Sequence, residues 1–168
     1  MILGFSTQLN SKPTYFVEKI HKGFRLQELN MKAGIDPDLH YPHDYNFVAK
    51  DKLHHKIHTI REDKKDRWKT DAKIDFFINC RQKNMFRFAP VLPVVTVQKI
   101  EIKWIGFSDS YRPWVKIDGK SIYTLDQFDS DKMLQLAQND GFDTIEDFFA
   151  YFNKDFTGKI IHWTDLKY

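Results

Sequence analysis

The stretch VVTVQKIEIKW, Val94–Trp104, decides the predicted fold. Its β-branched residues alternate with polar ones, which is typical of a strand with one buried face. The apolar positions change from odd numbers, Val95 and Val97, to even numbers, Ile100 and Ile102, halfway along the stretch. We therefore expect a β-bulge there, of the kind that bends strands in barrels.

Further strands are expected on both sides of this stretch. Downstream, Trp114–Ile117 and Ser121–Thr124 flank Asp118-Gly119, which is a strong hairpin signal. Upstream, the segment Ala72–Cys80 places Ile74, Phe76 and Ile78 on one face. The other expected strands are Ile2–Ser6, Lys56–Arg61, Met85–Phe88 and Lys159–Trp163.

Helices are expected near both ends of the chain. The first should begin at Ser11–Pro13 and end at Gly23, because proline favours a helix start and glycine a helix end. The second should be capped by Asp129 or Ser130. The third, over Thr144–Phe152, should be capped by Asp143 with Glu146 three residues later. Between the first helix and the strands, residues 25–55 form an irregular excursion with Gly34, Pro37 and Pro42.

This order of elements predicts an α+β fold. Neighbouring hairpins favour an antiparallel β-barrel with helices packed outside. A doubly wound α/β fold is not expected, because strands do not alternate with helices. Residues 1–168 are enough for one sizeable core, so we expect a single domain.

Composition narrows the class of protein. Apolar residues make up 42% and charged residues 29% of the chain, which is ordinary for a folded domain and excludes full disorder. The single cysteine, Cys80, excludes an intrachain disulfide, and polar residues follow Met1–Phe5 too soon for a signal peptide. No apolar run is long enough for a membrane helix. We expect a cytoplasmic protein that does not contact a membrane.

Charge is unevenly distributed although the net charge is only +3. Basic residues outnumber acidic ones over residues 50–73, and acidic residues outnumber basic ones over residues 118–168. A basic stretch is compatible with a nucleic-acid partner. The alternative is a solvated charged loop, since mixed-sign surface runs are common.

The segment KIHTIR, Lys56–Arg61, is the most informative for function. In a strand, Thr59 and Arg61 share one face, and His58 shares the other with Ile60. A hydroxyl beside a guanidinium suits a phosphate or a carboxylate. Lys56 can meet Thr59 only if it lies in the turn before the strand. The alternative is a structural strand whose Thr and Arg bond neighbouring backbone.

Three features together resemble a known family. They are a first helix ending at Gly23, the K-x-x-T-I-R pattern of Lys56–Arg61, and a turn containing Trp68 that leads into a strand. This arrangement is similar to the ASCH family of the PUA-like superfamily, and the likeness continues in the late helices and in Lys159–Trp163. The resemblance implies a small β-barrel with a cleft beside the motif. It also implies RNA binding or, as in one member type, an amidohydrolase activity on acetylcytidine.

The resemblance assigns roles to residues of this chain. Lys56 would be the base, Thr59 the nucleophile, and Arg61 a ligand-binding residue. The acidic residue before the last helix falls on Asp140, which is one methylene shorter than the family's Glu. Asp140 would orient Lys56 or balance its charge.

Other candidate residues lie nearby. Trp68 stands among Lys64, Lys65 and Arg67, which is typical of a base-stacking platform in a basic surface. The alternative is a Trp that covers the mouth of the barrel. His58 is a further candidate ligand-binding residue. The histidines are not spaced as zinc ligands usually are, so we expect no metal and no other cofactor; they are His40, His43, His54, His55 and His58.

Three functions remain compatible with the sequence. The preferred one is an RNA-binding or modified-nucleoside-binding domain. The second is an amidohydrolase of acylated nucleosides. The third is an accessory domain that contacts a protein partner through the excursion at residues 25–55. The sequence does not predict the oligomeric state.

Overall fold

The computed structural model describes residues 1–9, 11–26, 52–107, 110–124 and 130–168. Most of the predicted excursion at 25–55 lies outside these residues. His40, His43 and the candidate cap Asp129 also lie outside them. The described residues form a mixed α+β fold, as the order of elements predicted. No helix among them is long and apolar enough to cross a membrane.

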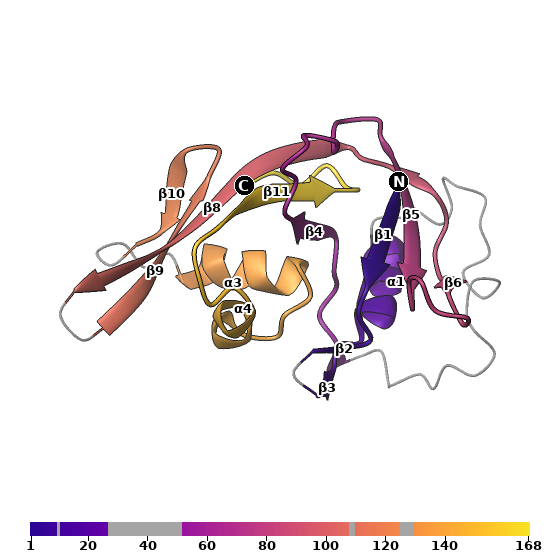
Figure 1. The fold of residues 1–168 in the computed structure, drawn as a ribbon, viewed down its shortest axis with the longest axis horizontal. Coiled ribbons are helices and arrows are strands. Elements are labelled where there is room, and N and C mark those ends of the chain that lie inside the picture. Colours follow the sequence, from indigo (N-terminus) through magenta and orange to yellow (C-terminus); the bar gives the residue numbers. More distant parts are fainter. Residues whose placement is uncertain (10, 27–51, 108–109, 125–129) are drawn as a thin grey trace.

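A five-stranded antiparallel sheet forms the larger part of the fold (Figure 1). Its strands lie in the order β10-β9-β8-β11-β4. The longest, β8, contains most of the stretch Val94–Trp104. Their bounds are β4 His58–Arg61, β8 Thr96–Phe107, β9 Ser110–Ile117, β10 Lys120–Tyr123 and β11 Phe156–His162.

The remaining strands form two smaller sheets. In one, β5 pairs in parallel with β1 and antiparallel with β6 and β7. The other is a short antiparallel pair, β2 with β3. Their bounds are β1 Ile2–Phe5, β2 Gln8–Leu9, β3 Lys12–Pro13, β5 Lys73–Ile78, β6 Phe86–Arg87 and β7 Leu92–Pro93.

The described helices pack on different parts of the molecule (Figure 1). Helix α1, Phe16–Leu26, lies beside β1 and β5. Helices α3, Ser130–Asn139, and α4, Ile145–Tyr151, cover one face of the five-stranded sheet. Each location has its own apolar core. The first core includes Phe24, Phe76 and Trp163, and the second includes Met133 and Phe148.

The closed antiparallel barrel is not confirmed. Strands β4 and β1 lie at sheet edges, and no backbone pairing joins them in the described part of the chain. A side chain bridges them instead, because Arg61 Nη2 donates to the carbonyl oxygen of Gly4 at 2.7 Å. In addition, β1 and β5 run parallel, so the strands are not all antiparallel.

The predicted bulge in β8 is wrong. Its pairing with β11 and β9 runs without a register shift through the middle of the strand. The apolar positions change parity because β8 contributes to both cores. Val97 packs against the first core on one face, whereas Ile100 and Ile102 belong to the second core on the other face.

The first helix also differs from its prediction. Ser11–Pro13 lies in the β2–β3 hairpin region, and α1 begins only at Phe16 and continues through Gly23. Gly23 does not end the helix but allows the Lys56 backbone to approach α1 closely. A Cβ there would lie 2.7 Å from the carbonyl oxygen of Lys56, so glycine lets this segment pack directly on α1.

Local signals elsewhere behave as predicted or nearly so. Asp118 and Gly119 have φ values of 48° and 80°, so the β9–β10 turn has the positive φ angles of a tight hairpin. Helix α4 is capped by Thr144, whose hydroxyl accepts from the Asp147 backbone N–H at 3.0 Å. The predicted cap, Asp143, is instead paired with Lys19.

Candidate functional site

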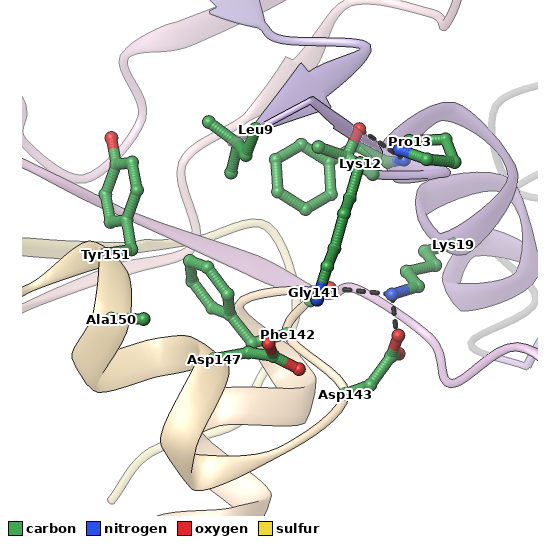
Figure 2. Close-up of a pocket in the computed structure, with 12 residues that line it drawn as sticks. Leu9, Lys12, Pro13, Lys19, Gly141, Phe142, Asp143, Asp147, Ala150 and Tyr151 are labelled. Carbon is green, nitrogen blue, oxygen red and sulfur yellow. Dashed lines mark hydrogen bonds and ion pairs between the residues drawn. The ribbon is translucent and has the colours of Figure 1, made fainter.

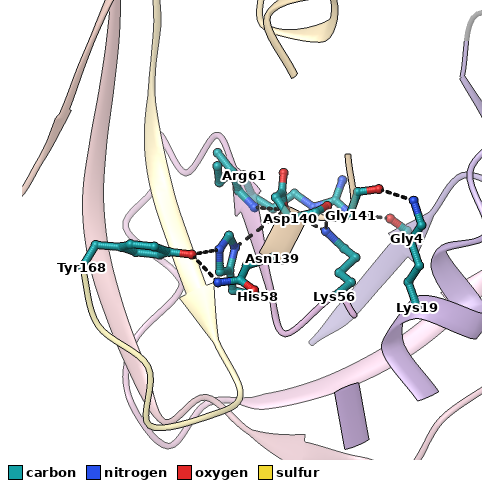
Figure 3. A network of polar contacts seen from close by, with 10 residues as sticks. Gly4, Lys19, Lys56, His58, Arg61, Asn139, Asp140, Gly141 and Tyr168 are labelled. Atoms are coloured by element: carbon teal, nitrogen blue, oxygen red, sulfur yellow. Dashed lines mark hydrogen bonds and ion pairs between the residues drawn. The ribbon is translucent and has the colours of Figure 1, made fainter. Parts of the chain in front are cut away.

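A buried ion pair joins Lys56 to Asp140 (Figure 3). Lys56 is 1% exposed and Asp140 is 4% exposed. The Lys56 ammonium donates to Asp140 Oδ1 at 2.7 Å and also to the Asp140 carbonyl oxygen. The same Oδ1 accepts from the Ile60 backbone N–H at 3.1 Å. The carboxylate therefore holds together the segment before β4 and the strand itself.

Backbone contacts place these two residues. The Lys56 N–H donates to the Lys19 carbonyl in α1, and the Ile57 N–H donates to the Asn139 carbonyl at the end of α3. Lys56 thus lies before the strand, as a meeting with Thr59 requires. After Asp140, Gly141 turns the chain with a φ of +96°.

Gly141 is also required by packing. A Cβ there would lie 2.7 Å from the Phe16 ring and 3.0 Å from Lys56 Cδ. The Asn139-Asp140-Gly141 sequence therefore ends α3 and leaves room for the Lys56 side chain.

Burial shifts the protonation equilibria of both partners. Burial lowers the pKa of Lys56 to about 8, and the negative charge of Asp140 opposes part of this shift. Burial raises the pKa of Asp140, and Lys56 opposes that shift. The pair therefore consists of an amine that is close to losing its proton and an acid that keeps its proton more readily than usual.

The predicted residues Lys56, Thr59, Arg61 and Asp140 line one small pocket. Its volume is about 40 Å³, which leaves room for a water molecule or a small functional group. Within the described structure, the Lys56 ammonium makes no hydrogen bond to Thr59, and its two hydrogen bonds both go to Asp140.

A larger pocket of about 320 Å³ adjoins the small one (Figure 2). Its volume lies at the lower end of the range for small-molecule sites, roughly 300–1,000 Å³. Four residues line both pockets and therefore connect them: Leu9, Phe16, Phe142 and Tyr151. Aromatic rings thus stand at the entrance to the buried ion pair.

Lys19 lines the wall of the larger pocket (Figure 2). Its side chain is 2% exposed, and its ammonium donates to the Gly141 carbonyl at 2.8 Å and to Asp143 Oδ1 at 2.7 Å. Asp143 is exposed. Lys19 therefore fixes the turn after α3 and places an acidic group at the rim.

Arg61 contacts three parts of the site. Its guanidinium donates to Gly4, lies 5.3 Å from the centroid of the Phe5 ring, and lines the small pocket. Its Nε is buried and has no hydrogen-bond partner among the described residues. Arg61 therefore keeps an unused donor next to the pocket.

His58 lies behind the ion pair rather than in the pocket. It is fully buried, and its Nε2 lies 2.8 Å from the Tyr168 hydroxyl, which also accepts from Asn139 Nδ2 at 2.8 Å (Figure 3). Its Nδ1 lies 3.8 Å from Asp140 Oδ1. Burial lowers the pKa of His58 well below its ordinary value. In this position the ring lies near Asp140 and is not accessible to a ligand.

The predicted basic surface is separate from the pocket residues. Lys64, Lys65 and Arg67 are exposed in the turn between β4 and β5. Trp68 is 5% exposed and belongs to the first core. Trp68 is therefore a core residue, and its buried ring has no free face for a base.

Sequence reasoning missed several residues of the site. Lys19, Phe16 and Tyr151 carry no local signal beyond their places in helices. Phe142 could have been noticed, because it directly follows the Asn139-Asp140-Gly141 turn that positions the acid. No group of three or more metal-ligating side chains is found within the described residues.

Comparison with known proteins identifies no similar protein. No family model, no curated protein and no solved structure matches this chain.

Proposed function

We propose that this chain binds RNA by accepting one nucleoside, modified or unmodified, in the paired pockets beside β4. The observation that carries the proposal is the buried Lys56–Asp140 ion pair at the floor of a pocket entered between aromatic rings. Burying two charges is costly, so such pairs at the bottom of a cleft are candidates for ligand contact.

The shapes of the pockets support a nucleoside. The larger pocket offers the rings of Phe16, Phe142 and Tyr151, against which a base can stack. The smaller pocket offers an ammonium, a carboxylate, a hydroxyl and a guanidinium, which suit the polar edge of a base or a small substituent on it.

Membership of the ASCH family within the PUA-like superfamily, with its barrel fold, belongs to this proposal. Its support is that Lys56, Thr59 and Arg61 of the K-x-x-T-I-R pattern line one pocket together with Asp140. The hydrogen bond from Arg61 to Gly4 between the edges of β4 and β1 is compatible with an open form of such a barrel.

Titration calorimetry with free nucleosides tests the binding proposal. Cytidine, uridine, adenosine, guanosine and acetylcytidine would each be titrated into the protein. We expect at least one to bind, and Tyr151→Ala to weaken that binding, because the ring stands at the shared entrance. An exposed tyrosine outside the pockets, Tyr111, supplies the matched control Tyr111→Ala. If none of the nucleosides gives a heat of binding, the proposal is refuted.

A second candidate, hydrolysis of acylated nucleosides, is favoured by the lowered pKa of Lys56. With a pKa of about 8, about a tenth of the amine is neutral at pH 7 and can accept a proton. In such a reaction the Thr59 hydroxyl would attack the acyl carbonyl and pass its proton to Lys56. The nucleoside amine would leave with that proton, and water would then release the acid from Thr59.

Mass spectrometry of acetylcytidine incubated with the protein distinguishes the two candidates. Hydrolysis predicts loss of an acetyl group that Thr59→Ala abolishes, and a rate that rises as the pH approaches 8. Binding alone predicts intact acetylcytidine at every pH. Thr59→Ser serves as the control, since it keeps the hydroxyl.

A further inference from the structure

Three cations lie side by side across the five-stranded sheet. Lys159 in β11 is directly opposite Arg61 in β4 on one side and Lys99 in β8 on the other. Directly opposite residues in antiparallel strands point to the same face, so the three form one row. This face is opposite to the one that α3 and α4 cover, because its neighbour Ile160 belongs to the second core.

Like charges that face each other across strands are unfavourable unless something offsets them. Lys159 has such partners in Asp63, at 3.1 Å, and Asp66, and Lys99 pairs with Glu101. Arg61 has no ion-pair partner in the described part of the chain, and its Nε is unpaired. The row therefore ends at the wall of the small pocket, in the guanidinium of Arg61.

The face continues beyond this row with further basic and aromatic side chains. Lys116 is opposite Glu101, and Trp114 is opposite Lys103, so all four point the same way. The Lys116 ammonium lies 4.2 Å from the centroid of the Trp114 ring, whose Nε1 donates to the Ser121 hydroxyl at 2.8 Å. The ring is therefore held in place on a partly exposed surface.

Three lysines surround Glu101 on this face. Glu101 hydrogen-bonds Lys99 and has Lys116 and Lys103 nearby, and together these cations lower its pKa. Lys99 pairs with Glu101 and Lys103 with Asp155, but the two lysines are 61% and 54% exposed, so a partner can still reach them.

The basic turn between β4 and β5 adjoins the same row. The Lys159 ammonium donates to the carbonyl oxygen of Trp68 at 2.8 Å and also to Asp66. These contacts anchor the turn that carries Lys64, Lys65 and Arg67 beside the centre of the row. The surface predicted from the sequence is thus extended by side chains of β8, β9 and β11.

We propose that a single strand of RNA crosses this sheet face, with phosphates on Lys99 and Arg61 at the two ends of the row and a base stacked on Trp114. The inference rests on the proposed function, because the row leads the strand to the pocket that receives one nucleoside. Phosphates on lysine and arginine supply affinity, and an aromatic ring supplies stacking that any base can use. An acidic protein surface would match the charge but would have no particular use for the held Trp ring.

Fluorescence anisotropy with labelled oligouridylate tests the proposal. We expect binding that weakens with salt, and a loss of about fivefold or more in Trp114→Ala. In Lys99→Ala/Lys103→Ala, the slope of log Kd against log salt should fall by about 0.7 for each phosphate that is no longer neutralised. Lys83→Ala, an exposed lysine outside the face, is the matched control and should bind like the parent chain.

The outcomes separate this surface from the pocket. Nucleoside binding without oligouridylate binding overturns the surface and leaves the proposed pocket intact. Salt-dependent oligouridylate binding that needs Trp114, without nucleoside binding, supports the surface and refutes the pocket. Equal losses for Lys83→Ala, unchanged affinity in Trp114→Ala, or tighter binding of oligothymidylate than of oligouridylate would each overturn the RNA surface.

Discussion

Asp140 Oδ1 accepts hydrogen bonds from the Lys56 ammonium at 2.7 Å and from the Ile60 backbone N–H at 3.1 Å. The segment before β4 and the strand itself therefore depend on one buried oxygen. Because Asp140 is 80 or more residues from both donors in the sequence, its carboxylate also ties the end of α3 to the sheet edge. The ion pair thus connects α3 to β4 and also lines the small pocket.

Removing one partner of this pair should be costly. Lys56→Met leaves a buried carboxylate without its cation, and Asp140→Asn leaves a buried ammonium without its anion. We expect each to lower the free energy of unfolding by about 3–5 kcal/mol. In Lys56→Met/Asp140→Asn the loss should be smaller than the sum, since neither charge is then left alone. Urea denaturation of the three variants measures these values.

An exposed pair of similar geometry provides the control. Lys103 and Asp155 lie 2.8 Å apart, but each side chain is 54% exposed. Lys103→Met and Asp155→Asn should therefore each cost less than about 1 kcal/mol, because water screens an exposed ion pair. Similar losses for both pairs would contradict the view that burial makes the Lys56–Asp140 contact important.

Gly141→Ala should destabilise the protein more than Gly119→Ala. Both glycines have positive φ values, 96° and 80°, so alanine is strained at either position. A Cβ at Gly119 would meet nothing within 4 Å, whereas one at Gly141 would overlap Phe16 and approach Lys56. We expect about 1–2 kcal/mol at Gly119 from strain alone, and about 1–3 kcal/mol more at Gly141 from overpacking.

Thermal and urea unfolding of the two alanine variants give this comparison. The displacement of Phe16 should also weaken any nucleoside binding in Gly141→Ala and leave it unchanged in Gly119→Ala. If both variants lose the same stability, the tight packing around Gly141 is not a constraint.

The relation between sequence and structure differs from element to element. Alternation of Ile74, Phe76 and Ile78 predicted β5, because one face of that strand is buried. The same reasoning failed halfway along β8, where the parity change predicted a bulge. A periodicity reports which positions are buried but not which core buries them, so one straight strand that serves two cores resembles a kinked one.

The site was predicted only in part, for a related reason. Lys56, Thr59, Arg61 and Asp140 came from a short motif and a family resemblance, and they meet in one pocket. Nothing local to Lys19 indicates its contact with Gly141 and Asp143, since that contact joins positions over a hundred residues apart. His58 and Trp68 were candidates because of their chemistry, but strand direction and packing place both inside the protein.

Stability should fall as the pH falls below the ordinary histidine range. His162 is fully buried, its ring nitrogens have no hydrogen-bond partner among the described residues, and burial lowers its pKa to about 4. The unfolded chain then binds a proton near pH 6.5, which the folded chain accepts only near pH 4. Neutral His162 therefore destabilises nothing above pH 6.5. As the pH falls from 6.5 to 4, protonation of the unfolded chain lowers the free energy of unfolding by about 3 kcal/mol.

Some charged groups near His162 raise its pKa and others lower it. His58, whose ring centroid lies 5.1 Å away, is itself buried with a lowered pKa, while Asp118 favours protonation of His162 and Lys167 opposes it. His162→Leu should therefore flatten the dependence of unfolding free energy on pH between 4 and 6.5 without abolishing it. The exposed His54 gives the control His54→Gln, and an unchanged pH profile in His162→Leu would disprove this origin of the acid sensitivity.

Arg61→Ala should loosen the contact between the two sheets. The guanidinium donates to the Gly4 carbonyl at 2.7 Å and lies over the Phe5 ring, and no backbone ladder joins β4 to β1 in the described residues. We expect the free energy of unfolding to fall by about 1.5–3 kcal/mol, the usual range for a hydrogen bond from a charged group, and amide exchange in β1 to become faster.

Arg87 is a matched control, because it lies over Phe77 at the same 5.3 Å but is 49% exposed. Arg87→Ala should cost less than about 1 kcal/mol and leave exchange in β1 unchanged, since water can replace what its surface contacts supply. If Arg61→Ala leaves exchange in β1 as slow as before, apolar packing between the sheets, and not the guanidinium, keeps the two edges together.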